Sequence, residues 1–560
     1  MPNRIFNYLH REFTGLHEAA FLLGGSAFLS QVLALLRDRL LAATFGSSTS
    51  LDVYYAAFKI PDFLFASIAS FVSVTVLIPF IVERLHDGRE KAAREFLNTV
   101  FTAFFAVMAL VCAVMWFIIP ALTPLTVPGF SASEQTAFIM LSRILLLSPL
   151  LLGLSNLLGS VTQAYKKFLI YALTPVVYNF GIIIGIVLFY PWFGLPGLAY
   201  GVILGALLHV GIQLPLLSKL NFFPEFTTAL DFKTLKKVVL ISLPRTFALA
   251  TDKISLLILV SIASLMGVGS ISIFNLALNL QSVPLAIVGV SYAVAAFPAL
   301  AQIFQRGNRE EFLEKIGTAV RHVIFWSLPA TMVFIVLRAQ IIRVLYGAGQ
   351  FNWSDTQLTA AALALFSISV VAQSLILLFV RGYYAGGKTY QPLIINVIFS
   401  ILTILFALLF MQWVQMSAVF NAMLDTVLRG ARVSNKAVLT LPLAYSLGDV
   451  LNAIALWWWF ARDFGTLPKN VFRSLMESIG AAVIAGYITY GALAYYGTVF
   501  NLTSTVGVFS QGVVGGLVGV AVTVLVLKLL KNEELGEIEV ALRHKFLPEV
   551  KESIIIDEQV

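Results

Sequence analysis

Runs of apolar residues recur along almost the whole chain, and each run is long enough to cross a membrane as a helix. A hydrocarbon core about 30 Å thick needs a helix of roughly 20 apolar residues. Only 12% of the 560 residues are charged, whereas a soluble domain carries about 25%. Most of the surface is therefore expected to face lipid, and the sequence predicts an all-α integral membrane protein.

The apolar runs predict fourteen spanning helices. They lie at residues 19–44, 51–83, 97–120, 133–164, 169–191, 195–217, 237–264, 270–302, 318–341, 356–382, 390–412, 438–461, 473–497 and 505–530. The chain then divides into an interfacial segment at 1–18, an N-lobe at 19–219 with helices 1–6, a C-lobe at 220–461 with helices 7–12, a last pair of helices at 462–530, and a charged tail at 531–560.

A short internal match points to duplication of the first six helices. Pro79 lies nine residues before Gly88, and Pro298 lies nine residues before Gly307. Each proline closes a long apolar run, the second and the eighth, and precedes a charged segment. Carriers that rock two halves around a central site are built from such repeats. Two similar loops of separate origin would look the same, so both interpretations stay open.

The basic residues indicate how the chain is oriented. The net charge is +8, and the even-numbered connections between helices carry 19 Lys and Arg residues, whereas the odd-numbered ones carry five. Because positive residues stay in the cytoplasm, the even connections and both termini are predicted to be cytoplasmic. Orientation explains the basic charge without a nucleic-acid partner.

Three segments are predicted to lie outside the spans. Residues 1–18 have an apolar face and are expected at the inner interface, while residues 531–560 form a charged cytoplasmic tail. Residues 414–430 have an apolar stripe at helical spacing, with polar residues opposite it. An amphipathic helix on the outer membrane surface is the expected structure.

Charged residues at the bilayer centre cost at least about 2.5 kcal/mol each, so their presence needs a reason. Seven polar residues on helices 1, 2, 7 and 8 are candidates for a substrate-binding cavity between the halves: Arg37, Asp38, Asp52, Lys59, Asp252, Lys253 and Asn279. Spacings of seven and three place Asp52, Lys59 and Asp62 on one helix face. Their cations would hold an anionic substrate. Structural ion pairs, or side chains that reach the interface, are the alternative.

Other polar motifs are expected to be structural. Residues 382–389, Gly-Tyr-Tyr-Ala-Gly-Gly-Lys-Thr, match the letters of a P-loop, but that motif needs a preceding strand. Spanning helices are predicted on both sides here, so a turn is expected. Arg143 and His209 stand alone in apolar helices and are expected to pack. No cofactor or metal site is predicted, and nothing points to an enzyme.

Several stretches resemble the lipid II flippases of the MurJ/MviN family. The first helix reads SQVLALLRDRLLAATFG at residues 30–46 and is followed by LDVYYAAFKIP at 51–61. Further similar stretches are PVVYN at 175–179, FGLPGLAYG at 193–201, QLP at 213–215, and PLAIVGV at 284–290 with the Phe-Pro pair at 297–298. The similarity extends over roughly residues 20–460.

The resemblance implies two six-helix halves plus two C-terminal helices, within the multidrug/oligosaccharidyl-lipid/polysaccharide exporter superfamily. It implies an undecaprenyl-pyrophosphate-linked substrate, the peptidoglycan precursor lipid II. Alternating access would move it from the inner to the outer leaflet of the bacterial inner membrane. Membrane lipids and cell-wall synthesis proteins are the implied partners. Arg37, Asp38, Asp52 and Lys59 fall on matching motif positions.

The sequence departs from the family where the family usually carries cavity arginines. Gln31, the pair Phe65-Ala66, and Asn279 occupy these positions. Either Arg37, Lys59 and Lys253 hold the headgroup instead, or the substrate differs. Three functions therefore stay open: a lipid II flippase, a small-molecule or drug exporter of the same superfamily, and a membrane scaffold that does not transport.

Overall fold

The computed structural model describes residues 16–86, 89–428, 433, 435–500 and 504–546. Every regular element within these ranges is a helix, which confirms the predicted all-α class. The predicted interfacial segment at residues 1–18 lies almost wholly outside the described residues.

Twelve of the fourteen predicted spans coincide with described helices that are long and apolar enough to cross a membrane. In chain order these are α6 (Glu90–Thr126), α7 and α8 (Ala132–Leu145, Leu147–Ala164), α9, η2 and α10 (Phe168–Ile184, Gly185–Phe189, Tyr190–Phe193), α11 and α12 (Leu195–Gly211, Leu214–Lys219), α13 (Phe232–Ser264), α14, η3 and α15 (Ser270–Pro284, Leu285–Val290, Ser291–Gln305), α16 (Arg309–Val336), α18 (Trp353–Ala385), α19 (Tyr390–Met416), η4 and α21 (Lys436–Leu439, Thr440–Phe464), α22 (Asn470–Val499) and α23 (Thr505–Leu529). The first two predicted spans coincide with α2 (Leu16–Phe45) and with a segmented second helix, so fourteen stands as an approximate count.

The second spanning segment is interrupted. It consists of α3 (Thr49–Ala57), α4 (Lys59–Ile68), η1 (Ala69–Val72) and α5 (Val74–His86). Pro61 has no N–H to donate to the carbonyl of Ala57, four residues earlier. The hydroxyl of Ser142 on α7 donates to that carbonyl instead, at 3.4 Å. A proline therefore accounts for the first break, and a neighbouring helix compensates for it.

One interruption, η1, falls close to a matching position of the predicted repeat. The offset in residue number between Pro79 and Pro298 also relates His86 to Gln305. These are the last residues of α5 and α15. With the same offset, η1, which is a 3₁₀ turn, overlaps the π-helical segment η3. This correspondence supports duplication. The division into lobes at residues 219 and 220 stays a prediction.

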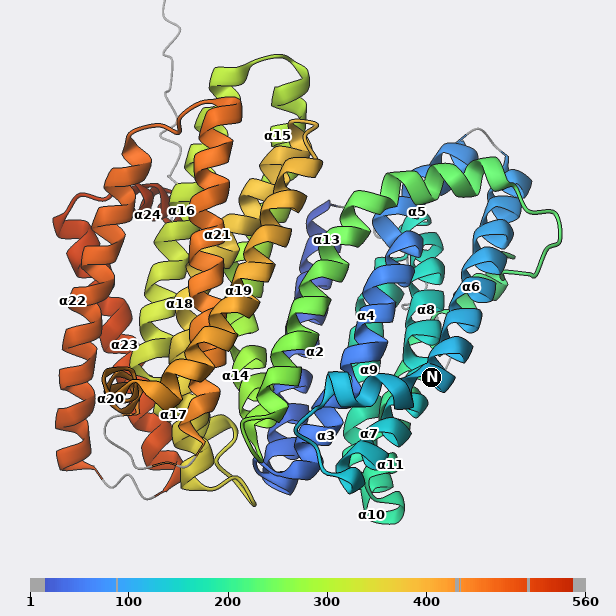
Figure 1. Ribbon diagram of the computed structural model, residues 1–560. Helices are drawn as coiled ribbons and strands as arrows, with labels where there is room; N and C mark the ends of the chain where they lie inside the picture. Colours follow the sequence, from blue (N-terminus) through green and yellow to red (C-terminus); the bar gives the residue numbers. More distant parts are fainter. Residues whose placement is uncertain (1–15, 87–88, 429–432, 434, 501–503, 547–560) are drawn as a thin grey trace, which may run out of the picture. The chain divides into compact units, whose positions relative to one another are not determined.

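The helices divide into two compact units. The first comprises Met1–Val283, Ile342–Ser369 and Lys388–Asn452, and the second comprises Pro284–Ile341, Val370–Gly387 and Ala453–Val560. Figure 1 labels the helices of both units.

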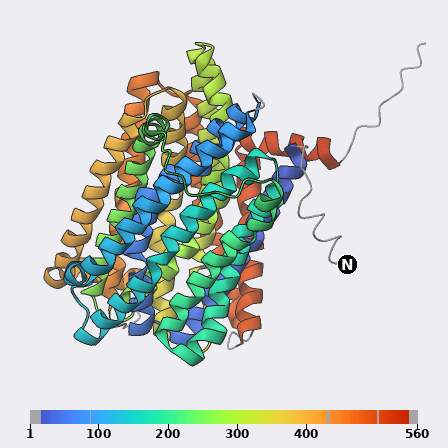
Figure 2. The same cartoon turned by 90° about the vertical axis from the view of Figure 1, so that its right-hand side faces the viewer.

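In the first unit, α9 and α11 pack backbone against backbone. A Cβ atom on Gly181 would lie 2.3 Å from the Cα of Gly205, and one on Gly185 would lie 2.5 Å from the Cα of Gly201. Small residues at four-residue spacing allow spanning helices to approach this closely. Figure 2 views this unit from the side on which α6 lies. There α5, α6 and α8 enclose an aromatic core that includes Phe80.

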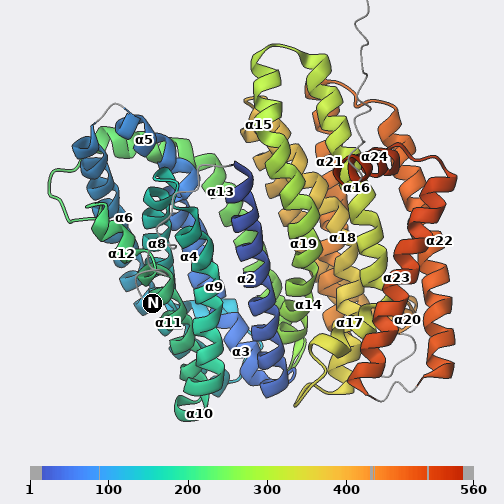
Figure 3. The same cartoon turned by 180° about the vertical axis from the view of Figure 1, so that it is seen from behind.

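In the second unit, α22 and α23 pack against each other and against α16 (Figure 3). The predicted tail is not wholly without structure, because its residues Glu533–Phe546 form helix α24. This helix contacts both α16 and α23.

The predicted amphipathic segment at residues 414–430 contains a short apolar helix, α20 (Ala418–Val427). Phe420 and Leu424 are buried against the protein, whereas Val419 is 81% exposed. Residues 429 and 430 lie outside the described ranges. Its position on the outer membrane surface stays a prediction.

The P-loop-like residues 382–389 consist of the last four residues of α18 and a short turn that leads to α19. α18 ends at Ala385, α19 begins at Tyr390, and Gly387 adopts a φ of 73°. A helix rather than a strand precedes the motif, as predicted.

Candidate functional site

All seven predicted site residues lie in the first unit, on α2, α3, α4, α13 and α14. They separate into three groups according to what they contact. One group joins α2 to its neighbours, one caps α14, and one surrounds a cavity beside α4.

Asp38 connects α2 to α14. Its Oδ1 accepts a hydrogen bond from Nε of Arg37 at 2.9 Å, and its Oδ2 accepts one from Nδ2 of Asn279 at 3.0 Å. Arg37 also donates from Nη1 to Oδ1 of Asn179 on α9, at 3.1 Å. The Asp38 side chain is 2% exposed and that of Arg37 is 21% exposed. The carboxylate is therefore bound by protein groups, while Arg37 keeps an accessible edge.

Asp52 caps the N-terminus of α14. Its Oδ2 accepts from the backbone N–H of Gly269 at 2.6 Å, and its Oδ1 accepts from the N–H and Oγ of Ser272 at 2.7 and 2.6 Å. A carboxylate at this position satisfies otherwise unpaired N–H groups and the helix dipole. Asp52 is buried. Its contacts favour the structural alternative for this residue over substrate binding.

Lys59 lies among other charged groups. Its Nζ donates to Oδ1 of Asn275 on α14 at 2.8 Å. It is also close enough to Asp62, Asp252 and Lys253 to interact with them electrostatically. Because this cluster contains two acids and two lysines, its formal charges cancel. Asp252 is the exposed member of the four.

A cavity of about 380 Å³ opens among α4, α8, α9 and α13. Asp62 and Lys253 line it, together with the polar groups of Asn156 and Tyr178. No side-chain hydrogen bond joins Asp62 or Lys253 to another described residue, although the two charges interact with each other. The cavity therefore brings Lys253, but not Asp52, to a place that a substrate can occupy.

The remaining wall of this cavity is largely apolar. Phe65 and Ala66, which stand where the resembling family carries arginines, both line it. Among the lining residues whose side chains the structure describes, Lys253 and Asp62 are the charged ones. Both positions therefore lie at the cavity and not on a distant surface.

Sequence reasoning left two amides without a specific partner. Asn179 binds Arg37 and also donates to Oγ of Ser30 at 3.2 Å, and Asn275 binds Lys59. A polar side chain in a spanning helix is costly without a partner. An amide in an otherwise apolar run is the signal that could have pointed to these residues.

Arg143 has the structural role expected for it. Its Nε donates to the carbonyl of Trp116 at 3.0 Å, and its guanidinium lies 5.0 Å from the centre of that ring. Pro120, four residues after Trp116, has no N–H to bond to this carbonyl. The arginine thus replaces a hydrogen bond that the proline removes. His209 is also packed, with its Nδ1 2.6 Å from Oγ of Ser155.

Sequence comparisons with known proteins point to one family. The profile of the family described as lipid II flippase MurJ matches residues 41–419. A probable lipid II flippase MurJ of Thermotoga maritima is 26% identical over 522 residues, which are 93% of this chain and 97% of that protein.

Solved structures show the same fold. A lipid II flippase MurJ in an inward closed conformation matches with a TM-score of 0.70 and 20% identity, covering 91% of this chain and all of that one. An inward-facing multidrug resistance MATE family transporter of the MOP superfamily matches with a TM-score of 0.61 and 16% identity, covering 79% of this chain and 95% of that one.

Proposed function

Because this chain belongs to the lipid II flippase MurJ family, we propose that it moves lipid II from the inner to the outer leaflet by alternating access. It is a multi-pass protein of the bacterial inner membrane with both termini in the cytoplasm, and a transporter rather than an enzyme. Membrane lipids surround it, and cell-wall synthesis proteins use its product. The membrane potential, worth about 2.3 kcal/mol per charge per 100 mV, is sufficient to bias such a carrier.

The cavity beside α4 is the observation that carries this proposal. Lys253 lines it without a side-chain hydrogen bond to another described residue, and a partly buried ammonium attracts phosphate oxygens more strongly than one in bulk water. Arg37 and Lys59 supply two further cations in the same unit. Asp38 and Asn279 position Arg37, Asp252 balances the lysines, and Asp52 holds α14.

Rescue of a cell depleted of its own lipid II flippase tests the function. The unchanged chain should restore growth, and Lys253→Ala and Arg37→Ala should fail although the protein reaches the membrane. Lys469→Ala, which removes an exposed cation outside the cavity, is the matched control and should rescue fully. Full rescue by both Lys253→Ala and Arg37→Ala would remove these residues from the site, and failure of the unchanged chain would contradict the function.

A small-molecule exporter is the second candidate. The neutral Phe65 and Ala66 in the cavity wall favour it, and the fold is shared with a MATE family transporter. Binding to the purified protein separates the two functions. We expect lipid II to bind more tightly than organic cations, and the reverse order would favour the exporter.

A further inference from the structure

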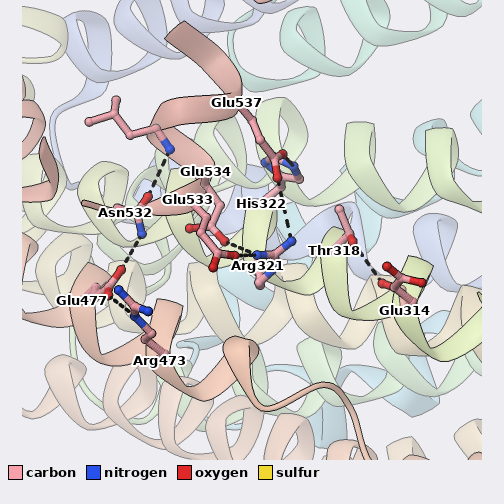
Figure 4. A network of polar contacts seen from close by, with 11 residues as sticks. Glu314, Thr318, Arg321, His322, Arg473, Glu477, Asn532, Glu533, Glu534 and Glu537 are labelled. Atoms are coloured by element: carbon pink, nitrogen blue, oxygen red, sulfur yellow. Dashed lines mark hydrogen bonds and ion pairs between the residues drawn. The ribbon is translucent and has the colours of Figure 1, made fainter. Parts of the chain in front are cut away.

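Helix α24 in the second unit is held by a buried arginine of α16 (Figure 4). Nη1 of Arg321 lies 2.6 Å from Oε2 of Glu533 and 3.2 Å from Oε1 of Glu534, and Nη2 lies 3.9 Å from Oε1 of Glu537. The Arg321 side chain is 9% exposed. Three carboxylates of one helical face therefore converge on a single guanidinium.

Two other contacts support this docking. Nε2 of His322, the next residue on α16, lies 3.1 Å from Oε2 of Glu537. Leu535 and Ile538 on α24 pack against a small buried cluster that includes Phe325 and Ala481. Among the described side chains of α24, two partly buried ones supply the apolar contacts, whereas the centre of the interface is charged.

The chain is built to turn α24 back toward α16. Lys531 has a φ of 54°, in the left-handed region that non-glycine residues seldom adopt. The next residue, Asn532, accepts the N–H of Leu535 on its Oδ1 at 3.1 Å, and donates from Nδ2 to Oε2 of Glu477 on α22 at 2.9 Å. One residue therefore starts α24 and also ties it to α22.

The charges decide how firmly α24 is held. Glu534 is almost completely buried, whereas the side chains of Glu533 and Glu537 are 54% and 51% exposed. A buried ion pair contributes little net stability, but the loss of one partner is strongly unfavourable. The surface that α24 covers carries Arg321, His322 and Glu477, which water can solvate when the helix leaves. Such an interface can open without exposing a large apolar patch.

We propose that α24 is a releasable latch that locks onto Arg321. In the docked state it ties the α22–α23 pair to α16, because α24 contacts α16 and α23 and Asn532 binds α22. In the released state α24 remains connected through the turn at Lys531, and Arg321 becomes accessible. The latch depends on the charge of Arg321 rather than on the apolar contacts of Leu535 and Ile538.

Distances between two spin labels test the latch in the full chain. Cysteines replace Val540 on α24 and Phe472 on α22, which are 55% and 65% exposed, in a background with Cys112→Ser. We expect one narrow distance distribution. Arg321→Gln should broaden it and raise the released population about tenfold or more, because it leaves Glu534 buried without its partner.

Two matched variants keep the test decisive. Lys528→Gln removes a cation that lies 3.7 Å from Glu539 and is 66% exposed, and this surface pair should have no effect on the distribution. A triple Glu533→Gln, Glu534→Gln, Glu537→Gln variant leaves the spanning helices unchanged and should release α24 as Arg321→Gln does. An unchanged narrow distribution in both Arg321→Gln and the triple variant would overturn the proposal, as would equal release by Lys528→Gln.

Discussion

The first unit contains two kinds of buried charge, and the contrast between Asp52 and Lys253 is the clearest case. Asp52 accepts three hydrogen bonds from the N-terminus of α14. Lys253 lines a cavity and makes no hydrogen bond with another described residue. Both are charged residues of spanning segments, and both were candidates on sequence alone. We therefore expect a membrane charge to serve function where its hydrogen-bonding capacity is not already used by the fold.

Other charged residues of the spanning segments can be classified in the same way. Asp38, Arg39 and Arg143 bind protein groups: Arg39 donates to the carbonyls of Val344 and Leu345 at the end of α17 (Arg338–Leu345). These residues hold helices together. Changing a charged residue that binds protein groups, as Asp52 does, should mainly lower stability. Changing a charged residue that lines the cavity, as Lys253 does, should mainly lower transport.

The largest effect is expected at Asp52. Asp52→Ala leaves three buried donors without an acceptor and should lower the free energy of unfolding by about 3 kcal/mol. Asp52→Asn keeps one acceptor oxygen and should lose about half as much. Unfolding in mixed micelles measures both. Normal unfolding of Asp52→Ala together with lost transport would move Asp52 into the substrate-contacting group.

The opposite pattern is expected at Lys253. Lys253→Met keeps the length of the side chain but removes its charge, and should slow lipid II transport about tenfold, as expected for a lost charge-assisted hydrogen bond. The free energy of unfolding should change by less than about 1 kcal/mol, because no side-chain hydrogen bond is lost and only the charge interactions with Asp62 and Asp252 are weakened. Transport in proteoliposomes and unfolding are measured on the same preparation, with Lys253→Arg as the control that retains charge. A large loss of stability would show that Lys253 belongs with Asp52.

Arg143 offers a test by compensation. Arg143→Gln removes the donor to the carbonyl of Trp116 and should lower the free energy of unfolding by about 1 kcal/mol, a typical upper value for hydrogen bonds within membranes. Pro120→Ala restores an N–H four residues after Trp116, so the double variant should lose less than the sum of the single losses. Strict additivity in this double-mutant cycle would contradict the role assigned to Arg143.

The smallest effect is expected at Arg39. Arg39→Ala removes a cation from the C-terminal carbonyls of α17 and should lower stability by about 0.5 kcal/mol. Hydrogen exchange of the amides near Leu345 should report this local loosening, with Arg39→Lys as the partial replacement. Loss of transport without faster exchange would place Arg39 among the substrate contacts.

The sequence predicted the spans well because hydropathy is a local property, as with α6 and α23. The role of Asp52 could not be predicted in this way, because its donors at Gly269 and Ser272 are brought to it only by the fold. Helix α24 was missed for a similar reason. Its glutamates resemble a solvated tail until Arg321 of α16 supplies their partner.

The lining of the cavity also could not be predicted from the sequence alone. Lys59, Asp62 and Lys253 were recognised as unusual, but spacing along one helix could not tell which of them faces open space. The family resemblance identified Phe65 and Ala66 as departures, and the structure adds that both line the cavity. The charges of these side chains follow from the residue types. Which side chains reach the cavity depends on how four helices pack, and this could not be predicted from the sequence.

The glycine contact between α9 and α11 has a consequence for how a lipid can reach the interior. Where Gly181 meets Gly205 and Gly185 meets Gly201, the backbones themselves touch, and no side chain can rotate aside to open a window. An acyl chain, which is about as wide as a side chain, cannot slip sideways through that seam. Any lateral entrance for a lipid into the first unit must therefore lie between other helices. The four glycines close the interface between α9 and α11 to an acyl chain.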